Sequence, residues 1–226
     1  MFTLFIANKN YSSWSLRPWV LMRELGITFE EDLVPFGDGS SWELFRAFSP
    51  SGKVPCLMDN GTAVWDSMGI TEYLAERREG IWPSDERARA WARCAAAEMH
   101  SGFSALRDIC GMSVGVRVAL HTISPALKKD IDRLEELWSE GLALFGGPYL
   151  AGGVFSAVDA FFAPVAFRIQ SYGLQMSPTS MAYAGLLLNL DSMKEWERDA
   201  LAEPWRDASH EVGVPDIGRV IADLRQ

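Results

Sequence analysis

Three serines surround a tryptophan near the amino terminus, and they are the first residues of the chain whose types and spacing favour chemistry. The stretch "NKNYSSWSLRPW" places Ser12, Ser13 and Ser15 between an apolar run and a pattern with helical spacing. Proline is tolerated in the first turn of a helix, so Pro18 predicts that a helix begins between residues 13 and 17. The serines then lie at the positive end of that helix, where hydroxyls and free N–H groups favour an anion. Serine is also a good N-cap, so a purely structural role remains an alternative.

A second polar group follows about forty residues later in the chain. The stretch "PSGKVPCL" puts Val54 and Pro55 at the start of a strand, and "WDSMGITEYL" puts Asp66 and Ser67 directly before a helix. A cis Val54–Pro55 bond would turn the backbone of Val54 outward, where an extended peptide can pair with it. Asp66 and Ser67 suit a ligand that carries both an ammonium and a carboxylate, although either residue is also a suitable helix cap.

The elements that must position these residues change in kind near residue 80. Before that point, local patterns predict a strand in "FTLFIA", a helix that stops at Gly26, a strand in "TFEEDLVPF", a short helix in "SSWELFRAFSP", a hairpin around Asn60 and a helix over 68–78. This order, βαβαββα, predicts a small mixed sheet in a first domain over residues 1–80.

From residue 85 onward, long helical patterns replace the strand signals. They cover residues 85–110, 124–145, 156–173 and 193–204, and they predict an all-helical second domain over 85–226. The segment that joins the two domains is short, so we expect them to pack against each other.

Composition excludes several classes of function. The chain has 226 residues, 48 % of them hydrophobic, and a formal net charge of -9, which argues against nucleic acid as a partner. Three cysteines and three histidines show no metal-ligand spacing, so we expect no metal and free thiols in a reducing compartment. With no signal-like leader and no apolar run of membrane-spanning length, we expect a cytoplasmic protein without membrane partners.

The order of the elements, together with "GKVPCL", "WDS" and the helical second half, resembles the cytosolic glutathione transferase family over essentially the whole chain. In addition, "AGGVFSAVDAFFAPV" is similar to the buried capping box of that family, here Ser156 to Asp159. The resemblance implies a thioredoxin-like, glutathione-binding first domain, a second domain that contributes the electrophile site, and a homodimer in which the first domain of each subunit meets the second domain of the other.

The resemblance also implies roles for the serines. In that family a residue at the start of the first helix donates a hydrogen bond to the glutathione sulfur. The stretch "SSWS" is similar to the "SSCS" of zeta-like members, and "SWSLRPW" is similar to the "CSLxPH" of beta-class members, with Trp14 in place of cysteine in both. Ser12 is the matching activator and Ser13 the alternative. Without the cysteine we do not expect thiol-transfer chemistry.

The rest of the site is transferred in the same way. The resemblance implies that Val54 pairs with the cysteinyl backbone of glutathione, that Asp66 and Ser67 hold its γ-glutamyl end, and that Lys53 reaches its glycyl carboxylate. For the electrophile, we expect a pocket between the domains lined by Tyr11, Trp14, Met99, Phe103 and Arg107. The apolar members are equally typical of plain core at helical spacing, and Arg107 is also typical of a solvated ion pair.

The predicted function is therefore a glutathione transferase that directs a thiolate at a small apolar electrophile and transfers alkyl or aryl groups. A hydroxyl donor contributes about 1.5–3 kcal/mol and the helix end about 0.3–1 kcal/mol, which lowers the pKa of the thiol by roughly one to three units. The alternatives are a zeta-like isomerase of maleylacetoacetate type, which Trp14 disfavours, a glutathione-dependent peroxidase, and a non-catalytic binding or regulatory module with the same fold.

Overall fold

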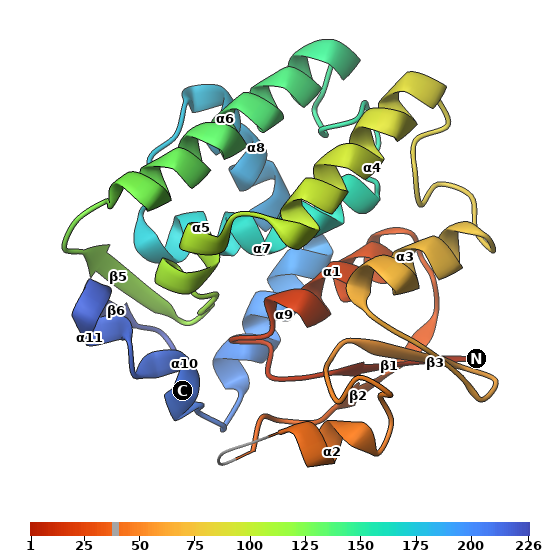
Figure 1. Ribbon diagram of the computed structural model, residues 1–226, viewed down its shortest axis with the longest axis horizontal. Coiled ribbons are helices and arrows are strands. Elements are labelled where there is room, and N and C mark those ends of the chain that lie inside the picture. The colour runs from red at the N-terminus through yellow and green to blue at the C-terminus, as the bar shows by residue number, and fades with distance from the viewer. Residues whose placement is uncertain (38–40) are drawn as a thin grey trace.

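A mixed four-stranded sheet forms the N-terminal domain of the computed structural model, which describes residues 1–37 and 41–226 (Figure 1). The strands have the order β2-β1-β3-β4, with bounds β1 Phe2–Ile6, β2 Phe29–Leu33, β3 Cys56–Asp59 and β4 Thr62–Val64. β1 and β2 are parallel because helix α1 (Ser13–Glu24) crosses between them, whereas β3 is antiparallel to both β1 and β4.

Two further helices complete the βαβαββα order predicted from the sequence. These are α2 (Trp42–Arg46) and α3 (Ser67–Ala75). The predicted second helix began at Ser40, which lies outside the described residues. The predicted start of α1 is confirmed, since α1 begins at Ser13, but Pro18 lies beyond the first turn and inside the helix. Proline at that position removes the intrahelical donor for the carbonyl of Trp14.

Helices dominate the C-terminal domain, as predicted (Figure 1). Their bounds are α4 Glu86–Ser101, α5 Ser104–Ile109, α6 Pro125–Phe145, α7 Ala157–Tyr172, α8 Pro178–Leu188, α9 Asp191–Ala202, α10 Ala208–Glu211 and α11 Val214–Ile217. The domain also contains an antiparallel pair of strands, β5 (Val116–Leu120) and β6 (Gly218–Asp223), which the sequence patterns did not predict. Helix α8 was not predicted either.

The helical pattern over residues 85–110 is divided into α4 and α5. Gly102 has an extended backbone, and Phe103 lies in the left-handed region with φ 58°. A Cβ at Gly102 would lie only 2.9 Å from the carbonyl oxygen of Glu98, so glycine permits the chain to turn closely past the end of α4. This turn sets the direction of α5 and of the arginine that it carries.

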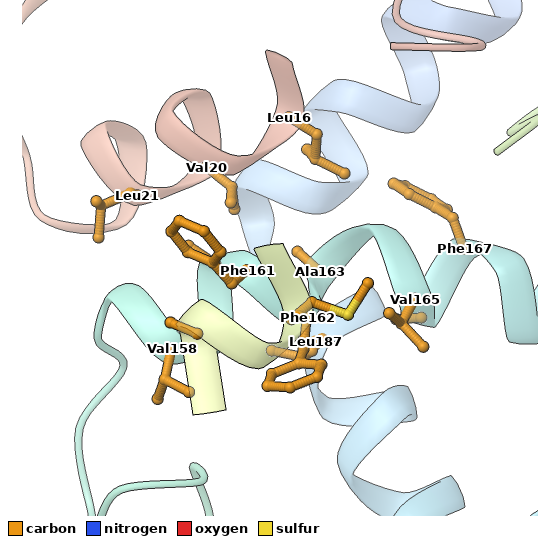
Figure 2. Packing of buried hydrophobic residues seen from close by; sticks show 14 of the residues in the cluster. Leu16, Val20, Leu21, Val158, Phe161, Phe162, Ala163, Val165, Phe167 and Leu187 are labelled. Carbon is orange, nitrogen blue, oxygen red and sulfur yellow. The ribbon is translucent and has the colours of Figure 1, made fainter. Parts of the chain in front are cut away.

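The two domains share one hydrophobic core where α1 packs against α7. Figure 2 shows Leu16 and Val20 of α1 opposite Phe161 of α7, and all three side chains are fully buried. The predicted capping box is present at the start of α7, where the Asp159 carboxylate accepts a hydrogen bond of 2.9 Å from the N–H of Ser156. This packing fixes α7 beneath the N-terminus of α1.

Polar contacts add a second connection between the domains. The ammonium of Lys9 is nearly buried and forms ion pairs of 2.9 Å with both Glu31 and Asp199. The carboxylate of Glu203, which follows α9, accepts hydrogen bonds from the backbone N–H groups of Lys9 and Asn10. The loop that leads into the serine cluster is therefore held by the opposite domain.

Candidate active site

A cavity of about 360 Å³ lies between the two domains at the N-terminus of α1. Residues of the loop before α1, the loop before β3, α5, α7 and α10 line it. The structure brings seven of the predicted site residues together there: Tyr11, Ser12, Ser13, Trp14, Lys53, Val54 and Arg107. Four others, Met99, Phe103, Asp66 and Ser67, do not line this cavity in the part of the chain that the structure describes.

The hydrogen bonds distinguish the two serines that the sequence left open. Ser12 is the N-cap residue of α1, and its hydroxyl donates to the Ser15 hydroxyl at 2.7 Å. The Ser13 hydroxyl instead accepts from Nη2 of Arg168 at 3.3 Å. A hydroxyl has a single proton to donate, so the proton of Ser12 is engaged inside the protein whereas that of Ser13 is available to a ligand. The geometry thus favours Ser13, the alternative, over Ser12, the residue that the resemblance favoured.

Arg168 is buried on α7 and faces the cavity behind Ser13. Its Nη1 donates to the carbonyl of Cys110, and its Nε has no hydrogen-bond partner among the described residues. Burial, with a further contribution from the positive charge of Arg107, lowers the pKa of Arg168 to about 10. The side chain therefore remains charged at neutral pH and polarises the Ser13 hydroxyl to which it donates.

Two more arginines lie around the Trp14 ring. The guanidinium carbons of Arg17 and Arg107 are 4.2 and 5.0 Å from the ring centroid. Arg107 lines the cavity and donates to the carbonyl of Gly102 at 2.9 Å. Burial lowers the pKa of Arg17, and the charges of Arg107 and Arg168 lower it further. Three cations close to the positive end of α1 give this cavity a preference for anions.

Asp66 and Ser67 occupy the N-terminus of α3, beside the cavity rather than in its lining. Asp66 caps the helix, as the structural alternative predicted, because its Oδ1 accepts from the N–H of Met68 at 2.9 Å. Its Oδ2 lies 3.3 Å from Nε2 of His100. Ser67 is fully buried, and its hydroxyl lies 3.4 Å from Nη1 of Arg17.

Met99 and Phe103 belong to the core and not to the predicted electrophile pocket. They are only 1 % and 6 % exposed and are not among the residues that line the cavity in the described part of the chain. The apolar wall comes instead from Phe36, Phe45 and Met112, which lie in other segments of the chain. The helical spacing therefore predicted correctly that Met99 and Phe103 are buried. It did not predict that they are buried in the core and not in the wall of the cavity.

The bond between Val54 and Pro55 is cis. Lys53 is exposed, and both Lys53 and Val54 line the cavity on the side of the N-terminal domain. A basic side chain and the backbone that leads into β3 therefore lie beside each other at one wall of the cavity. This arrangement can accept an extended peptide with a terminal carboxylate.

The segment that contains α10 and β6 closes another side of the cavity and was not predicted to take part. The Tyr11 hydroxyl donates to Glu211 and accepts from Nη1 of Arg225 at 2.9 Å. Burial and the hydrogen bond to Glu211 raise the pKa of Tyr11 to about 12, so this phenol stays protonated. His210 stacks on Tyr11 and lines the cavity.

Of the residues that the sequence analysis missed, Arg168 had a visible signal. It is the only charge after Asp159 in the otherwise apolar pattern of α7, and a cation in a helix that is apolar on all sides requires a buried partner. His210 had no comparable signal, because its position depends on contacts with residues about 200 positions earlier. Among the described residues, no His, Cys, Asp or Glu side chains are grouped as a metal ion requires, and no helix has the length and apolarity to cross a bilayer.

Comparisons with known proteins agree with this architecture. The family model described as glutathione S-transferase, N-terminal domain, matches residues 11–77, and the C-terminal domain model matches residues 118–205. Glutathione S-transferase-like protein OpS6 of Beauveria bassiana is 26 % identical over 168 residues, which are 71 % of this chain and 76 % of that protein. Maleylacetoacetate isomerase of Rattus norvegicus is 27 % identical over 173 residues, which are 74 % and 78 % of the two chains. The stringent starvation protein A homolog of Haemophilus ducreyi is 24 % identical over 188 residues, 81 % of each chain.

Solved structures show the same fold. A glutathione transferase homolog from Burkholderia, with bound glutathione, superposes with a TM-score of 0.65 at 20 % identity and covers 88 % of this chain and 97 % of its own. Glutathione S-transferase isozyme E7 of Drosophila melanogaster has a TM-score of 0.67 at 18 % identity and covers 96 % and 97 % of the two chains. With both domain models matched in order along one chain and this fold around the cavity, the protein belongs to the glutathione S-transferase family.

Proposed function

We propose that the protein is a glutathione transferase that ionises the glutathione sulfur at the N-terminus of α1 and directs it at a small apolar electrophile in the cavity between the domains. The observation that carries this proposal is the hydrogen bond of 3.3 Å from Arg168 to the Ser13 hydroxyl, in a cavity that Ser13 itself lines. Ser13 is the donor to the sulfur, and Ser12 supports the turn by its bond to Ser15.

The Ser13 hydroxyl and the N-terminus of α1 can supply the free energy that is needed to ionise the glutathione thiol at neutral pH. A free thiol has a pKa of about 8.5 and is only a few per cent ionised at pH 7. A hydroxyl that donates to the thiolate contributes about 1.5–3 kcal/mol, and the end of α1 about 0.3–1 kcal/mol. Together these lower the thiol pKa by about one to three units, and the charge of Arg168 strengthens the donor.

The tripeptide would lie along the wall formed by the N-terminal domain. The backbone of Val54 pairs with the cysteinyl residue, and the exposed ammonium of Lys53 meets the glycyl carboxylate. At the other end, Asp66 takes the γ-glutamyl ammonium. The γ-glutamyl carboxylate meets the N-terminus of α3, with Arg17 behind it on the far side of Ser67.

The electrophile would occupy the remaining space beside Tyr11, Trp14 and Phe36. These rings provide an apolar, aromatic surface, and the sulfur would lie at its edge next to Ser13. A homodimer and a cytoplasmic location, which the family resemblance implies, complete the proposal.

A second candidate is glutathione-dependent isomerisation of an acidic substrate. The specific observation in its favour is that Arg107 lines the cavity and lies 5.0 Å from the Trp14 ring, where it can meet a substrate carboxylate. The rat relative named maleylacetoacetate isomerase agrees with this alternative. Turnover of a cis-configured, unsaturated dicarboxylate without net consumption of glutathione would distinguish isomerisation from transfer.

The transferase proposal is tested with the variants Ser13→Ala and Ser12→Ala. We expect retention of the wild type and of both variants on immobilised glutathione, because the tripeptide is bound mainly by other residues. Ser13→Ala should raise the pKa of the bound thiol by about one to two units and lower turnover at neutral pH by about 10- to 100-fold. Ser12→Ala should have a smaller effect on the thiol pKa.

The outcomes separate three explanations. If Ser12→Ala raises the thiol pKa and Ser13→Ala does not, the role belongs to Ser12. If the wild type is retained by glutathione but turns over no electrophile and no isomerase substrate, the non-catalytic module is the better account. If the wild type is not retained at all, the glutathione site itself is refuted.

A further inference from the structure

The segment over residues 207–225 places a histidine at the edge of the cavity, opposite the N-terminal domain. The His210 ring stacks on Tyr11 at a centroid distance of 5.1 Å and contacts the tilted ring of Phe36 at 5.0 Å. It lines the same cavity as Ser13. These two ring contacts restrain the orientation of the imidazole.

A carboxylate orients that imidazole. Oδ2 of Asp207 lies 2.7 Å from Nδ1 of His210, and Oδ1 of Asp207 accepts from the backbone and the hydroxyl of Ser209. Burial acts to raise the pKa of the Asp207 carboxyl, but its hydrogen bonds with Ser209 and His210 outweigh burial and hold that pKa below the usual range. The carboxylate is therefore ionised at neutral pH and keeps the proton of a neutral imidazole on Nδ1.

The other ring nitrogen remains available. Nε2 of His210 has no hydrogen-bond partner in the part of the chain that the structure describes. An imidazole that is oriented through one nitrogen and free at the other is the usual arrangement of a general acid–base catalyst. No sequence motif around His210 indicated this arrangement.

We propose that His210, oriented by Asp207, carries the proton of the reaction, and that the site is suited to electrophiles whose product retains the electron pair and must gain a proton, such as enones and epoxides. This inference rests on the proposed function. It assigns a substrate class, electrophiles to which glutathione adds without loss of a leaving group, and it assigns a catalytic residue on the C-terminal segment. His210 touches the reacting atoms through Nε2, whereas Asp207 acts as a positioning residue.

The proton balance of an addition explains why such a residue is useful. Nε2 of neutral His210 accepts the thiol proton of glutathione, and the thiolate then forms a C–S bond with the β-carbon of an enone. The electron pair of the double bond moves toward the carbonyl oxygen, and the resulting enolate receives at its α-carbon the proton that His210 held. The products are the thioether and neutral His210, so no other reactant is needed.

Substitution at an aryl halide has a different balance. The halide leaves with the negative charge, no carbon or oxygen atom requires protonation, and the thiol proton can pass to solvent. Loss of His210 would therefore affect addition, in which a proton must be returned to the product, far more than substitution, in which solvent can take the thiol proton. Comparing two substrates on one enzyme isolates this difference.

Several charged or titratable groups surround His210 and contribute to any pH profile. On its own segment these are Asp207, Glu211 and Arg225, and on the elements packed around the cavity they are Tyr11, Lys53, Arg107 and Arg168. All of them are unchanged by substitution of His210 itself. A difference between the profiles of the wild type and a His210 variant therefore reports on the imidazole.

The test uses His210→Gln, His210→Phe and Asp207→Asn with an enone and with chlorodinitrobenzene. Phenylalanine retains the stacked ring without the nitrogens. We expect both His210 variants to lose about 100-fold in kcat with the enone and less than about 3-fold with the aryl chloride. Asp207→Asn should lose about 10-fold with the enone. Added imidazole should restore part of the enone rate in a His210→Ala variant.

His121→Gln is the matched control, because His121 is exposed and its ring contacts the carbonyl of Pro215 outside the cavity lining. Its rates should equal those of the wild type with both substrates. Equal losses with both substrates in His210→Phe would show a packing role, and an unchanged enone rate would show no role; either result overturns this inference alone. A wild type that turns over neither substrate overturns the proposed function together with it.

Discussion

Replacing Arg168 with glutamine should shift the ionisation of bound glutathione without removing the Ser13 hydroxyl. Nη2 of Arg168 lies 3.3 Å from Ser13 Oγ. A hydrogen bond from that hydroxyl to sulfur adds about 3 Å, so the guanidinium lies about 6 Å from the thiolate. At an effective dielectric constant of about 20, two unit charges at that distance interact by about 3 kcal/mol, which corresponds to about two pKa units.

The direction follows from the sign of the charge. The cation favours the thiolate, so Arg168→Gln should raise the thiol pKa by up to about two units and lower turnover at pH 7 by about 30-fold. At about pH 9 the variant should approach the wild-type rate, because the thiol is ionised in both proteins. The assay is the pH dependence of kcat for an aryl chloride, together with ultraviolet titration of the bound thiolate.

The result that refutes this reasoning is a uniform loss of activity at every pH, which would show that Arg168 only supports the packing between α7 and Cys110. The exposed Arg87 offers a matched control, since Arg87→Gln removes the same charge at the surface and should leave the pH profile unchanged. Unfolding curves of both variants separate a shift in ionisation from a loss of folded protein.

Three further predictions concern the scaffold. Burial raises the pKa of Asp159 from 3.8 to about 6, so the folded state binds this proton more tightly than the unfolded state, and the free energy of unfolding should fall by about 3 kcal/mol from pH 4 to 6. Urea unfolding of Asp159→Asn should show no such dependence of stability on pH. An unchanged pH dependence in that variant contradicts the assignment. Lys9→Met leaves Glu31 and Asp199 without their shared cation and should cost about 3 kcal/mol in urea unfolding, whereas a cost below about 1 kcal/mol would show that this ion pair is not important. Gly102→Ala places a methyl group 2.9 Å from the Glu98 carbonyl oxygen and should cost about 1–3 kcal/mol by thermal unfolding; an unchanged midpoint would mean that the turn adjusts freely.

The N-terminal domain could be predicted because its elements are short and each has a local signal. Pro55 directly precedes β3, and Asn60 lies in the two-residue turn between β3 and β4. In the C-terminal domain, the capping box of Ser156 and Asp159 is a similarly local signal, because it spans four positions. Such signals act between neighbours in sequence, so the chain pattern contains them. The family resemblance then predicted that these elements together bind one ligand, glutathione.

The parts that could not be predicted depend on distant contacts. β5 and β6 pair across about 100 residues, and neither strand is long enough for its own alternation to stand out. The sequence pattern around Phe103 continues as a helix, yet the chain turns there, with Phe103 in the left-handed region, and α5 packs against α6. Arg168, which donates to the Ser13 hydroxyl, lies 155 positions later, and no local pattern contains that contact.

The hydrogen bonds from the backbone of Lys9 and Asn10 to the Glu203 carboxylate limit how the two domains can be exchanged by engineering. Glu203, which follows α9, holds the turn that contains the serines in place. The first 80 residues therefore cannot be transferred to another protein without losing this contact. A chimera that grafts them onto the helical half of another family member would have to carry a matching acid at position 203. Recombination at the linker alone should yield folded hybrids whose serine turn is misaligned.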